Sequence, residues 1–225
     1  MTKRNDEVHQ QKFTVEARAV KDDEAKDSGS ENNEEKNVTA AKNRILASSC
    51  SKSGKYLALC DDLKQLHLYK FDENWKFLNL RSVARRCTAL TFASDDQHVL
   101  VSDKTGDVYR FSVEDPNHTG ELILGHLSMV LDIVVAQSDR YVVTCDRDEK
   151  IRVSSYPNAY SIHSYCLQHT EYVACILYIK DHDVLVSGGG DGKIILWNLD
   201  GSALFDIDCK DADTEFKGTE SENGT

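Results

Sequence analysis

Apolar and polar residues alternate along much of this chain, in short runs that turn-forming residues separate. In Tyr141–Ser155, two runs rich in β-branched side chains, Tyr141–Cys145 and Lys150–Ser155, flank a short, highly charged connection. β-Branched residues favour strands, and aspartate-rich connections favour tight turns. The stretch therefore predicts a β-hairpin.

The same hairpin is repeated in Val184–Trp197. Asp148 and Asp191 lie 43 residues apart, and so do Lys150 and Lys193. A repeat of this length is typical of propeller blades, each made of four antiparallel strands. We therefore expect the chain to be built from such blades.

Short strands at regular spacing divide the chain into four units. The expected strands are Ile45–Ser49, Tyr56–Cys60, Leu66–Phe71 and a vaguer one around Trp75–Leu80; Cys87–Phe92, His98–Ser102 and Val108–Val113; Val130–Val135, Tyr141–Cys145, Lys150–Ser155 and Ser161–Leu167; and Val173–Ile179, Val184–Ser187, Lys193–Leu199 and Ala203–Ile207. No helix of ten or more residues is expected. The sequence thus predicts an all-β propeller fold with about four recognisable blades within residues 45–208.

The two ends of the chain differ from this central part in composition. Residues 1–44 are rich in Lys, Glu, Asp, Asn and Ser, and within them only Phe13–Val20 shows apolar alternation. Residues 209–225 are polar and acidic. Segments with so few apolar residues cannot bury enough surface to fold, so we expect both ends to be mostly disordered.

The chain carries a formal net charge of −11. Binding of a nucleic acid needs a basic surface, so the chain is not expected to be the main RNA-binding platform of an assembly. It has seven cysteines but no C-x-x-C pair, and no signal peptide or membrane-length apolar run is visible. These features indicate a reducing compartment. We expect the nucleus, and also the cytoplasm, and no membrane partner.

Motifs for catalysis and metal binding are missing from the sequence. Asp146, Asp148 and Lys150 are spaced like the start of a calcium loop, but no glycine stands at its sixth position and no glutamate at its twelfth. Gly188–Gly190 precedes a strand, so it lacks the helix N-terminus that would hold a phosphate. No nucleophile motif or methyl-donor-binding unit is present either. We expect no enzymatic activity, no cofactor and no metal.

Several residues resemble the WD-repeat family: Gly125-His126 and Gln168-His169 resemble its Gly-His element, and Leu196-Trp197-Asn198 resembles its Trp-Asp ending. In that family a His, a strand Ser or Thr, a turn Asp and a Trp form a buried hydrogen-bonded tetrad. The resemblance implies a complete tetrad in the fourth unit and an incomplete one in the third, where Ser154 stands in place of Trp. The implied members are His169, Ser187, Asp191 and Trp197, and His126, Thr144 and Asp148.

More specific motifs are found in three stretches, Val83–Phe92, Gly125–Met129 and Asp146–Ser154. They resemble a narrower family, the WD-repeat, non-catalytic subunits of tRNA guanine-N7 methyltransferases. The resemblance implies a seven-bladed propeller that binds and stabilises a separate catalytic subunit, with tRNA bound through the complex. Because only about four blades are recognisable, we expect the chain to be a fragment or shortened form of such a subunit.

The charged hairpin is the candidate contact with the catalytic subunit, because the resemblance places the contact on this motif. Its residues are Asp148, Glu149, Lys150 and Arg152. Lys150 and Arg152 are expected to share an exposed strand face, because side chains two residues apart point the same way. Arg85 and Arg86 are candidates for a contact with the partner or with RNA, or are ordinary surface charges.

A different class of function stays open: a substrate receptor of a ubiquitin ligase, or another peptide-binding propeller. Many such receptors end a blade with Trp-Asp-x-Arg, whereas this chain has Trp197-Asn-Leu-Asp200. The missing arginine disfavours this alternative without excluding it.

Overall fold

The computed structural model describes residues 43–209. The expectations for Phe13–Val20 and for residues 210–225 fall outside this range, and so does almost all of the expectation for residues 1–44. The described residues form sixteen β-strands and no α-helix. None of them therefore belongs to a helix that is long and apolar enough to cross a membrane.

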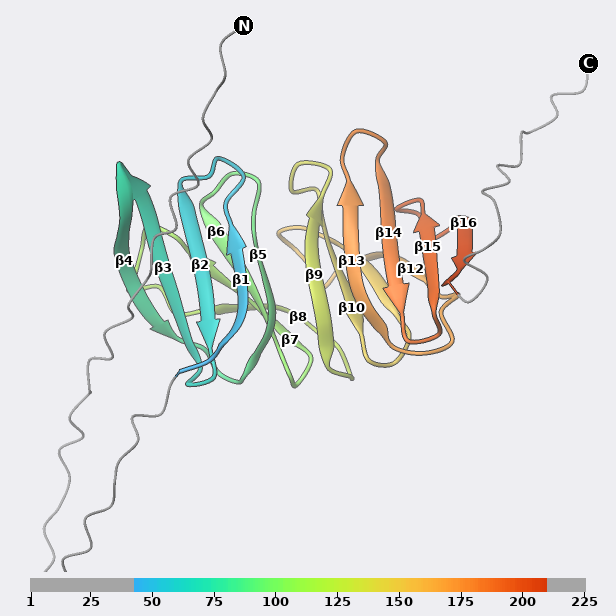
Figure 1. Ribbon diagram of the computed structural model, residues 1–225, viewed down its shortest axis with the longest axis horizontal. Helices are drawn as coiled ribbons and strands as arrows, with labels where there is room; N and C mark the ends of the chain where they lie inside the picture. The colour runs from blue at the N-terminus through green and yellow to red at the C-terminus, as the bar shows by residue number, and fades with distance from the viewer. Residues whose placement is uncertain (1–42, 210–225) are drawn as a thin grey trace, which may run out of the picture. The chain divides into compact units, whose positions relative to one another are not determined.

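The strands form four antiparallel sheets of four, and each sheet uses four consecutive strands (Figure 1). The first sheet contains β1 (Ile45–Cys50), β2 (Tyr56–Asp61), β3 (Gln65–Asp72) and β4 (Asn74–Ser82); the second contains β5 (Cys87–Phe92), β6 (His98–Asp103), β7 (Asp107–Ser112) and β8 (Glu121–Gly125). The third contains β9 (Val130–Ala136), β10 (Tyr141–Asp146), β11 (Ile151–Ser155) and β12 (Ile162–Cys166); the fourth contains β13 (Val173–Ile179), β14 (Val184–Gly189), β15 (Lys193–Trp197) and β16 (Ala203–Asp208). The prediction of an all-β fold with four propeller blades is confirmed.

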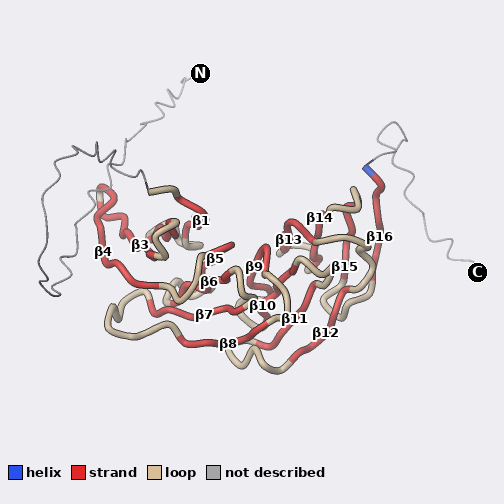
Figure 2. Tube along the Cα trace, turned by 90° about the horizontal axis from the view of Figure 1, so that it is seen from below, coloured by secondary structure: helices blue, strands red, loops and turns tan. Residues whose placement is uncertain are grey.

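The four sheets follow one another along an arc (Figure 2). The first strands of neighbouring sheets, β1, β5, β9 and β13, contact one another on the inner side of this arc. The last strands, β4, β8, β12 and β16, lie on its outer side. This is the arrangement of propeller blades around an axis.

Apolar side chains fill the spaces between the sheets. One buried cluster joins the first two sheets, a second joins the middle pair, and a third joins the last pair through residues such as Val143, Ile151, Ile195 and Trp197. Alternate residues of a strand point to opposite sides, so a middle sheet contributes to two clusters. Complete burial of one such side chain stabilises the fold by about 1.5–3 kcal/mol.

One end of the arc has a regular build that positions the candidate site. We call it the lower end, after its place in Figure 1; it holds the turns between the second and third strand of each sheet and the loops before each first strand. In every sheet a backbone N–H of the turn donates to a carbonyl of the loop that lies 18 residues earlier. These bonds are Asp62 to Arg44, Lys104 to Arg86, Arg147 to Met129 and Gly190 to Tyr172, at 2.8–3.0 Å.

Two strands differ from the sequence expectation. The strand β8 was not predicted, because the third unit was taken to begin at Gly125. Its side chains do not alternate in burial: Ile123 and Leu124 are both buried, beside a register shift between Val108 and Tyr109. The strand β4, expected only vaguely, is the longest of the sixteen at nine residues. Both lie on the outer side of the arc, where half-exposed strands carry the weakest apolar pattern.

Candidate partner-binding surface

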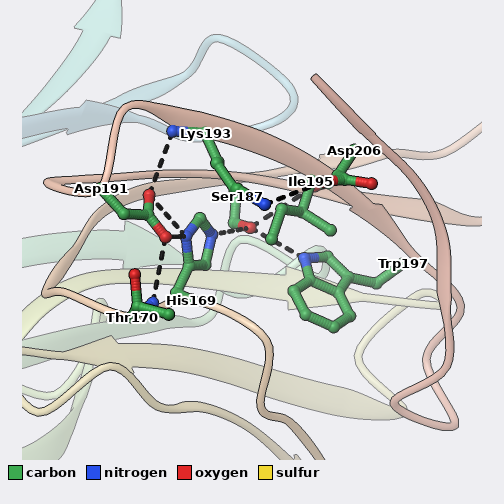
Figure 3. Close-up of polar contacts among 8 residues, drawn as sticks. All are labelled: His169, Thr170, Ser187, Asp191, Lys193, Ile195, Trp197 and Asp206. Atoms are coloured by element: carbon green, nitrogen blue, oxygen red, sulfur yellow. Dashed lines mark hydrogen bonds and ion pairs between the residues drawn. The ribbon is translucent and has the colours of Figure 1, made fainter. Parts of the chain in front are cut away.

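A buried polar network closes the lower end of the fourth sheet (Figure 3). His169 Nε2 lies 2.8 Å from Ser187 Oγ, and His169 Nδ1 lies 2.9 Å from Asp191 Oδ2. The indole N–H of Trp197 donates to Ser187 Oγ over 2.8 Å. The structure thus brings together the four residues that the family resemblance implied for this unit.

The chemistry of these groups limits the directions of the hydrogen bonds. The indole N–H of Trp197 can only donate, so Ser187 Oγ accepts there; its own proton has two acceptors within reach, His169 Nε2 at 2.8 Å and the carbonyl of Ile195 at 3.4 Å. His169 Nδ1–H then donates to Asp191, whose carboxylate also accepts the backbone N–H groups of Thr170 and Lys193 at 3.0 Å. Burial alone would raise the pKa of Asp191, but these hydrogen bonds hold it below its usual value. Each of the four side chains therefore has a hydrogen-bond partner, and the role of the network is to stabilise the fold.

The third sheet holds its histidine with a different aspartate from the one expected. His126 Nδ1 lies 2.9 Å from Asp146 Oδ2, and His126 Nε2 lies 2.7 Å from Thr144 Oγ1. Asp148 is exposed, and the carboxylate that meets His126 Nδ1 belongs to Asp146. The assignment of Asp148 to the network is wrong, and Asp146 takes that place.

A shared turn explains this correction. At the end of β10, Asp146 Oδ1 accepts the backbone N–H groups two and four residues further on, at 2.9 and 3.1 Å. Asp61 and Asp103 do the same in the first two sheets. In the fourth sheet this position is Gly189, and the aspartate lies two residues later, at Asp191. The 43-residue spacing aligned Asp148 with Asp191, which lies two residues later in its turn than the aspartates of the other sheets. The spacings of 42 and 43 residues between Asp61, Asp103 and Asp146 would have predicted the correct residue.

The first two sheets complete this turn in other ways. Asp61 Oδ2 lies 2.9 Å from Nε2 of His67, which comes from β3 and not from a loop. Val83 occupies the loop position in the second sheet that corresponds to His126, four residues before the first strand. Asp103 Oδ2 is buried there and has no hydrogen-bond partner among the described residues.

Arg152 lies inside the molecule and is not exposed on the hairpin. It is 8% exposed; its Nε donates to Ser154 Oγ over 3.1 Å, and its NH1 donates to the carbonyl of Gly125 over 3.0 Å. Burial lowers the pKa of the Arg152 guanidinium. The expectation that Lys150 and Arg152 share an exposed face is wrong. Lys150 belongs to the turn, whereas Arg152 pairs across the sheet with buried Thr144 and fills space that the small Ser154 leaves.

The lower end nevertheless presents a charged surface. The four turn residues Arg147, Asp148, Glu149 and Lys150 are all exposed. Arg85 and Arg86 are also exposed. They lie in the loop before β5, where the carbonyl of Arg86 accepts the backbone N–H of Lys104 from the turn between β6 and β7. The structure therefore places all of the predicted contact residues except Arg152 on one end of the molecule.

Four exposed apolar residues on this end were missed by the sequence reasoning: Leu63, Leu127, Leu167 and Tyr172. Leu127, in the loop before β9, is fully exposed, and Tyr172, in the loop before β13, is 47% exposed. Aromatic side chains such as that of Tyr172 are enriched in the central contacts of protein interfaces. Leu127 stands in the Gly-His-Leu-Ser-Met stretch, so its sequence signal was the motif itself.

The described residues hold no group of three or more His, Cys, Asp or Glu side chains that could bind a metal ion. The histidines of the lower end are engaged within their own sheets.

Comparison with known proteins decides the family. The family model described as the tRNA methyltransferase TRM82 WD40 domain matches residues 2–116 and 112–223. The chain belongs to this family. The resemblance noted from Val83–Phe92, Gly125–Met129 and Asp146–Ser154 is confirmed.

The chain is also similar to named relatives from other organisms. A relative from Mus musculus, named as the non-catalytic subunit WDR4 of tRNA (guanine-N(7)-)-methyltransferase, is 54% identical over 68% of this chain and 37% of its own length. The subunit of the same name from Danio rerio is 44% identical over 86% of this chain and 46% of its own length. The Drosophila melanogaster relative, the non-catalytic subunit wuho, is 41% identical over 66% of this chain and 35% of its own length. The chain spans less than half the length of these relatives.

Proposed function

We propose that this chain acts as a non-catalytic scaffold of a tRNA guanine-N7 methyltransferase, and that it binds and stabilises the separate catalytic subunit. It contacts tRNA only through the complex, and the complex works in the nucleus. Membership of the TRM82-type WD40 family and the names of the relatives support the scaffold role. The net charge of −11 supports the proposal that a more basic partner, and not this chain, makes the main contact with the tRNA.

The observation that carries the proposal is the exposed turn Arg147–Lys150 on the hydrogen-bonded lower end. Its backbone is fixed by Asp146 on one side and by Met129 on the other. A turn held in this way loses little conformational entropy when a partner binds. Leu127 beside it offers an apolar anchor, and charges of both signs around the anchor provide orientation.

Arg152 has a positioning role in this proposal. Its guanidinium joins β11 to the carbonyl of Gly125 at the end of β8, so it links the hairpin to the neighbouring sheet. Removing this cation would move the turn and disturb the loop that carries Leu127. The partner contact itself falls to the exposed Lys150 and its neighbours.

Calorimetric titration of the catalytic subunit into the 225-residue chain tests the proposal. We expect Lys150→Glu and Leu127→Asp each to weaken binding at least tenfold, about 1.4 kcal/mol. The matched control is Lys180→Glu, an exposed lysine in the turn after β13, at the opposite end of the sheets, which should leave the affinity unchanged.

Three outcomes would overturn the proposal: no binding by the unmodified chain, equal binding by all variants, or capture of a ubiquitin-ligase adaptor in place of the methyltransferase subunit. Cell fractionation with an antibody to the chain tests the nuclear location.

A further inference from the structure

The two ends of the arc each present a sheet face that no other sheet of the described residues covers. Figure 2 shows the first and fourth sheets at opposite ends of the arc, which is open on one side. Each of these sheets buries one face against its neighbour in the chain. Its other face packs against no further sheet of residues 43–209. The side chains of these two faces determine what can bind there.

The uncovered face of the fourth sheet is apolar across three strands. Ile176 and Ile195 point into the buried cluster with the third sheet, so their neighbours along each strand point away from it. The register of β13, β14 and β15 then brings four apolar side chains together on the uncovered face, which we call the fourth end face: Leu177, Val186, Ile194 and Leu196. Leu177 is 60% exposed and Ile194 is 36% exposed. An apolar sheet face that is this exposed is uncommon unless something binds it.

The uncovered face of the first sheet is also largely apolar. Leu66 and Leu68 point into the cluster with the second sheet, so the alternate residues of these strands point the other way. The register places four of them on the uncovered face, which we call the first end face: Leu57, Leu59, His67 and Leu80. Leu80 is 46% exposed, whereas His67 is buried and engaged by Asp61. The first end face can therefore bury apolar surface against a partner.

The two end sheets carry opposite net charges. Residues 43–82, which form the first sheet, contain seven Lys and Arg and four Asp and Glu, a net charge of +3. Residues 173–209, which form the fourth sheet, contain two Lys and six Asp, a net charge of −4. A first end face and a fourth end face therefore attract each other, whereas two like faces repel. Within one chain the two faces lie at opposite ends of the arc, so the complementary face comes from a second copy.

We propose that two copies of the chain associate head to tail, with the first end face of each copy against the fourth end face of the other. Two such contacts, related by a twofold axis, close two arcs of four sheets into one ring. The combined number of sheets is within the range of about four to eight blades that is typical of propellers. Side chains of the faces make the contact, and no strand edge takes part. The inference goes beyond the scaffold function, because it assigns a partner to surfaces away from the lower end.

Size-exclusion chromatography with light scattering measures the assembly of the 225-residue chain. We expect a mass of twice 25.3 kDa that falls toward 25.3 kDa on dilution. Leu177→Glu in the fourth end face and Leu80→Glu in the first should each weaken association by at least about tenfold, because each places an unpaired carboxylate in both contacts of the ring. The matched control is Leu122→Glu, since this leucine is 41% exposed but belongs to β8 on the outer side of the arc. It should leave the association unchanged.

Mixing the two variants separates head-to-tail pairing from the pairing of like faces. Leu177→Glu keeps an intact first end face, and Leu80→Glu keeps an intact fourth end face, so a mixed pair has one undamaged contact. An equimolar mixture should therefore recover a dimer at concentrations at which each variant alone is a monomer. This recovery also shows that both variants are folded.

Four results would overturn the proposal: an unmodified chain that is monomeric at every concentration, masses above that of a dimer, loss of association in only one of the two variants, or no recovery of the dimer in their mixture. A monomer would assign the end faces to another segment of this chain or to a different protein. Loss in only one variant would assign the contact to two like faces.

Discussion

The third and fourth sheets build the same corner of the molecule with different chemistry. In the fourth sheet Trp197 donates to Ser187, and the network consists of neutral donors that end on one carboxylate. In the third sheet the tryptophan position is Ser154, and the buried cation Arg152 reaches into the space. Both networks hold a loop histidine against a strand hydroxyl.

The difference lies in which residue of the repeated turn holds the histidine. In the fourth sheet the turn aspartate is Asp191, so the turn itself is used to hold His169. In the third sheet Asp146, at the end of the strand, does this work, and the next four residues are exposed. The third sheet therefore gains an exposed charged turn, but it has to bury a cation.

The buried cation offers the largest expected effect. Arg152→Glu would place a carboxylate near Asp146 and leave the Gly125 carbonyl without its donor. We expect the free energy of unfolding to fall by about 3–5 kcal/mol, the usual cost of breaking a buried charged contact. Urea denaturation followed by circular dichroism measures this change.

The control for this variant is Lys150→Glu, two residues away in the exposed turn. We expect its unfolding midpoint to match that of the unmodified chain, because the lysine side chain lies in solvent. Equal stability of the two variants would show that Arg152 is not the buried link between β11 and β8 that its hydrogen bonds indicate.

The tryptophan of the fourth sheet should come next. Trp197→Phe removes the hydrogen bond to Ser187, worth about 1 kcal/mol, and part of a packed side chain, worth a further ~1–2 kcal/mol. The expected total is about 2–3 kcal/mol, measured by the same denaturation experiment. Trp75→Phe in β4, where Trp75 is half-buried, is the matched control. An equal loss of stability there would show that the hydrogen bond from Trp197 to Ser187 adds nothing to the stability of the fold.

The aspartate of the third sheet should have a smaller, pH-dependent effect. Burial alone would raise the pKa of Asp146, but hydrogen bonds from His126, Lys150 and Asp148 bring it below its usual value of 3.8. A carboxyl group with a lowered folded-state pKa stabilises the fold above the unfolded pKa, and this contribution is lost as the pH falls through the folded pKa. We expect Asp146→Asn to cost about 1–2 kcal/mol at pH 7, which spans the upper end for an ordinary hydrogen bond and the lower end for one to a charged group.

The pH profile of the pair sharpens this expectation. The stability difference between the unmodified chain and Asp146→Asn should stay constant from pH 7 to about pH 5 and shrink below about pH 4. Asp148→Asn should show no such difference at any pH, since the exposed Asp148 does not hold the histidine. If Asp148→Asn showed this pH dependence and Asp146→Asn did not, the assignment of Asp148 to the network would be correct.

Much of this fold was visible in the sequence because its strands repeat with turn residues between them. The four sheets and the complete network of the fourth sheet followed from period-two alternation and from family motifs. The position of the turn aspartate in the fourth sheet could not be predicted from the 43-residue spacing alone. In that sheet Gly189 stands at the end of the strand, and Asp191, two residues later, holds the histidine. The burial of Arg152 depends on the small Ser154 beside it and on a carbonyl 27 residues away, so no local pattern reports it.

The second sheet supplies the smallest expected effect and a direct check on the role of the histidine. Asp103 uses Oδ1 for the turn, as Asp146 does, but Oδ2 has no histidine to meet because Val83 occupies that loop position. In Asp103→Asn the amide oxygen keeps the turn bonds, and the NH2 group replaces an oxygen that has no partner among the described residues. We therefore expect unfolding free energies within about 0.5 kcal/mol of the unmodified chain at pH 7, against about 1–2 kcal/mol for Asp146→Asn. Parallel urea titrations of the two variants make the comparison. Equal losses would mean that the turn alone, and not the histidine, accounts for the contribution of both aspartates.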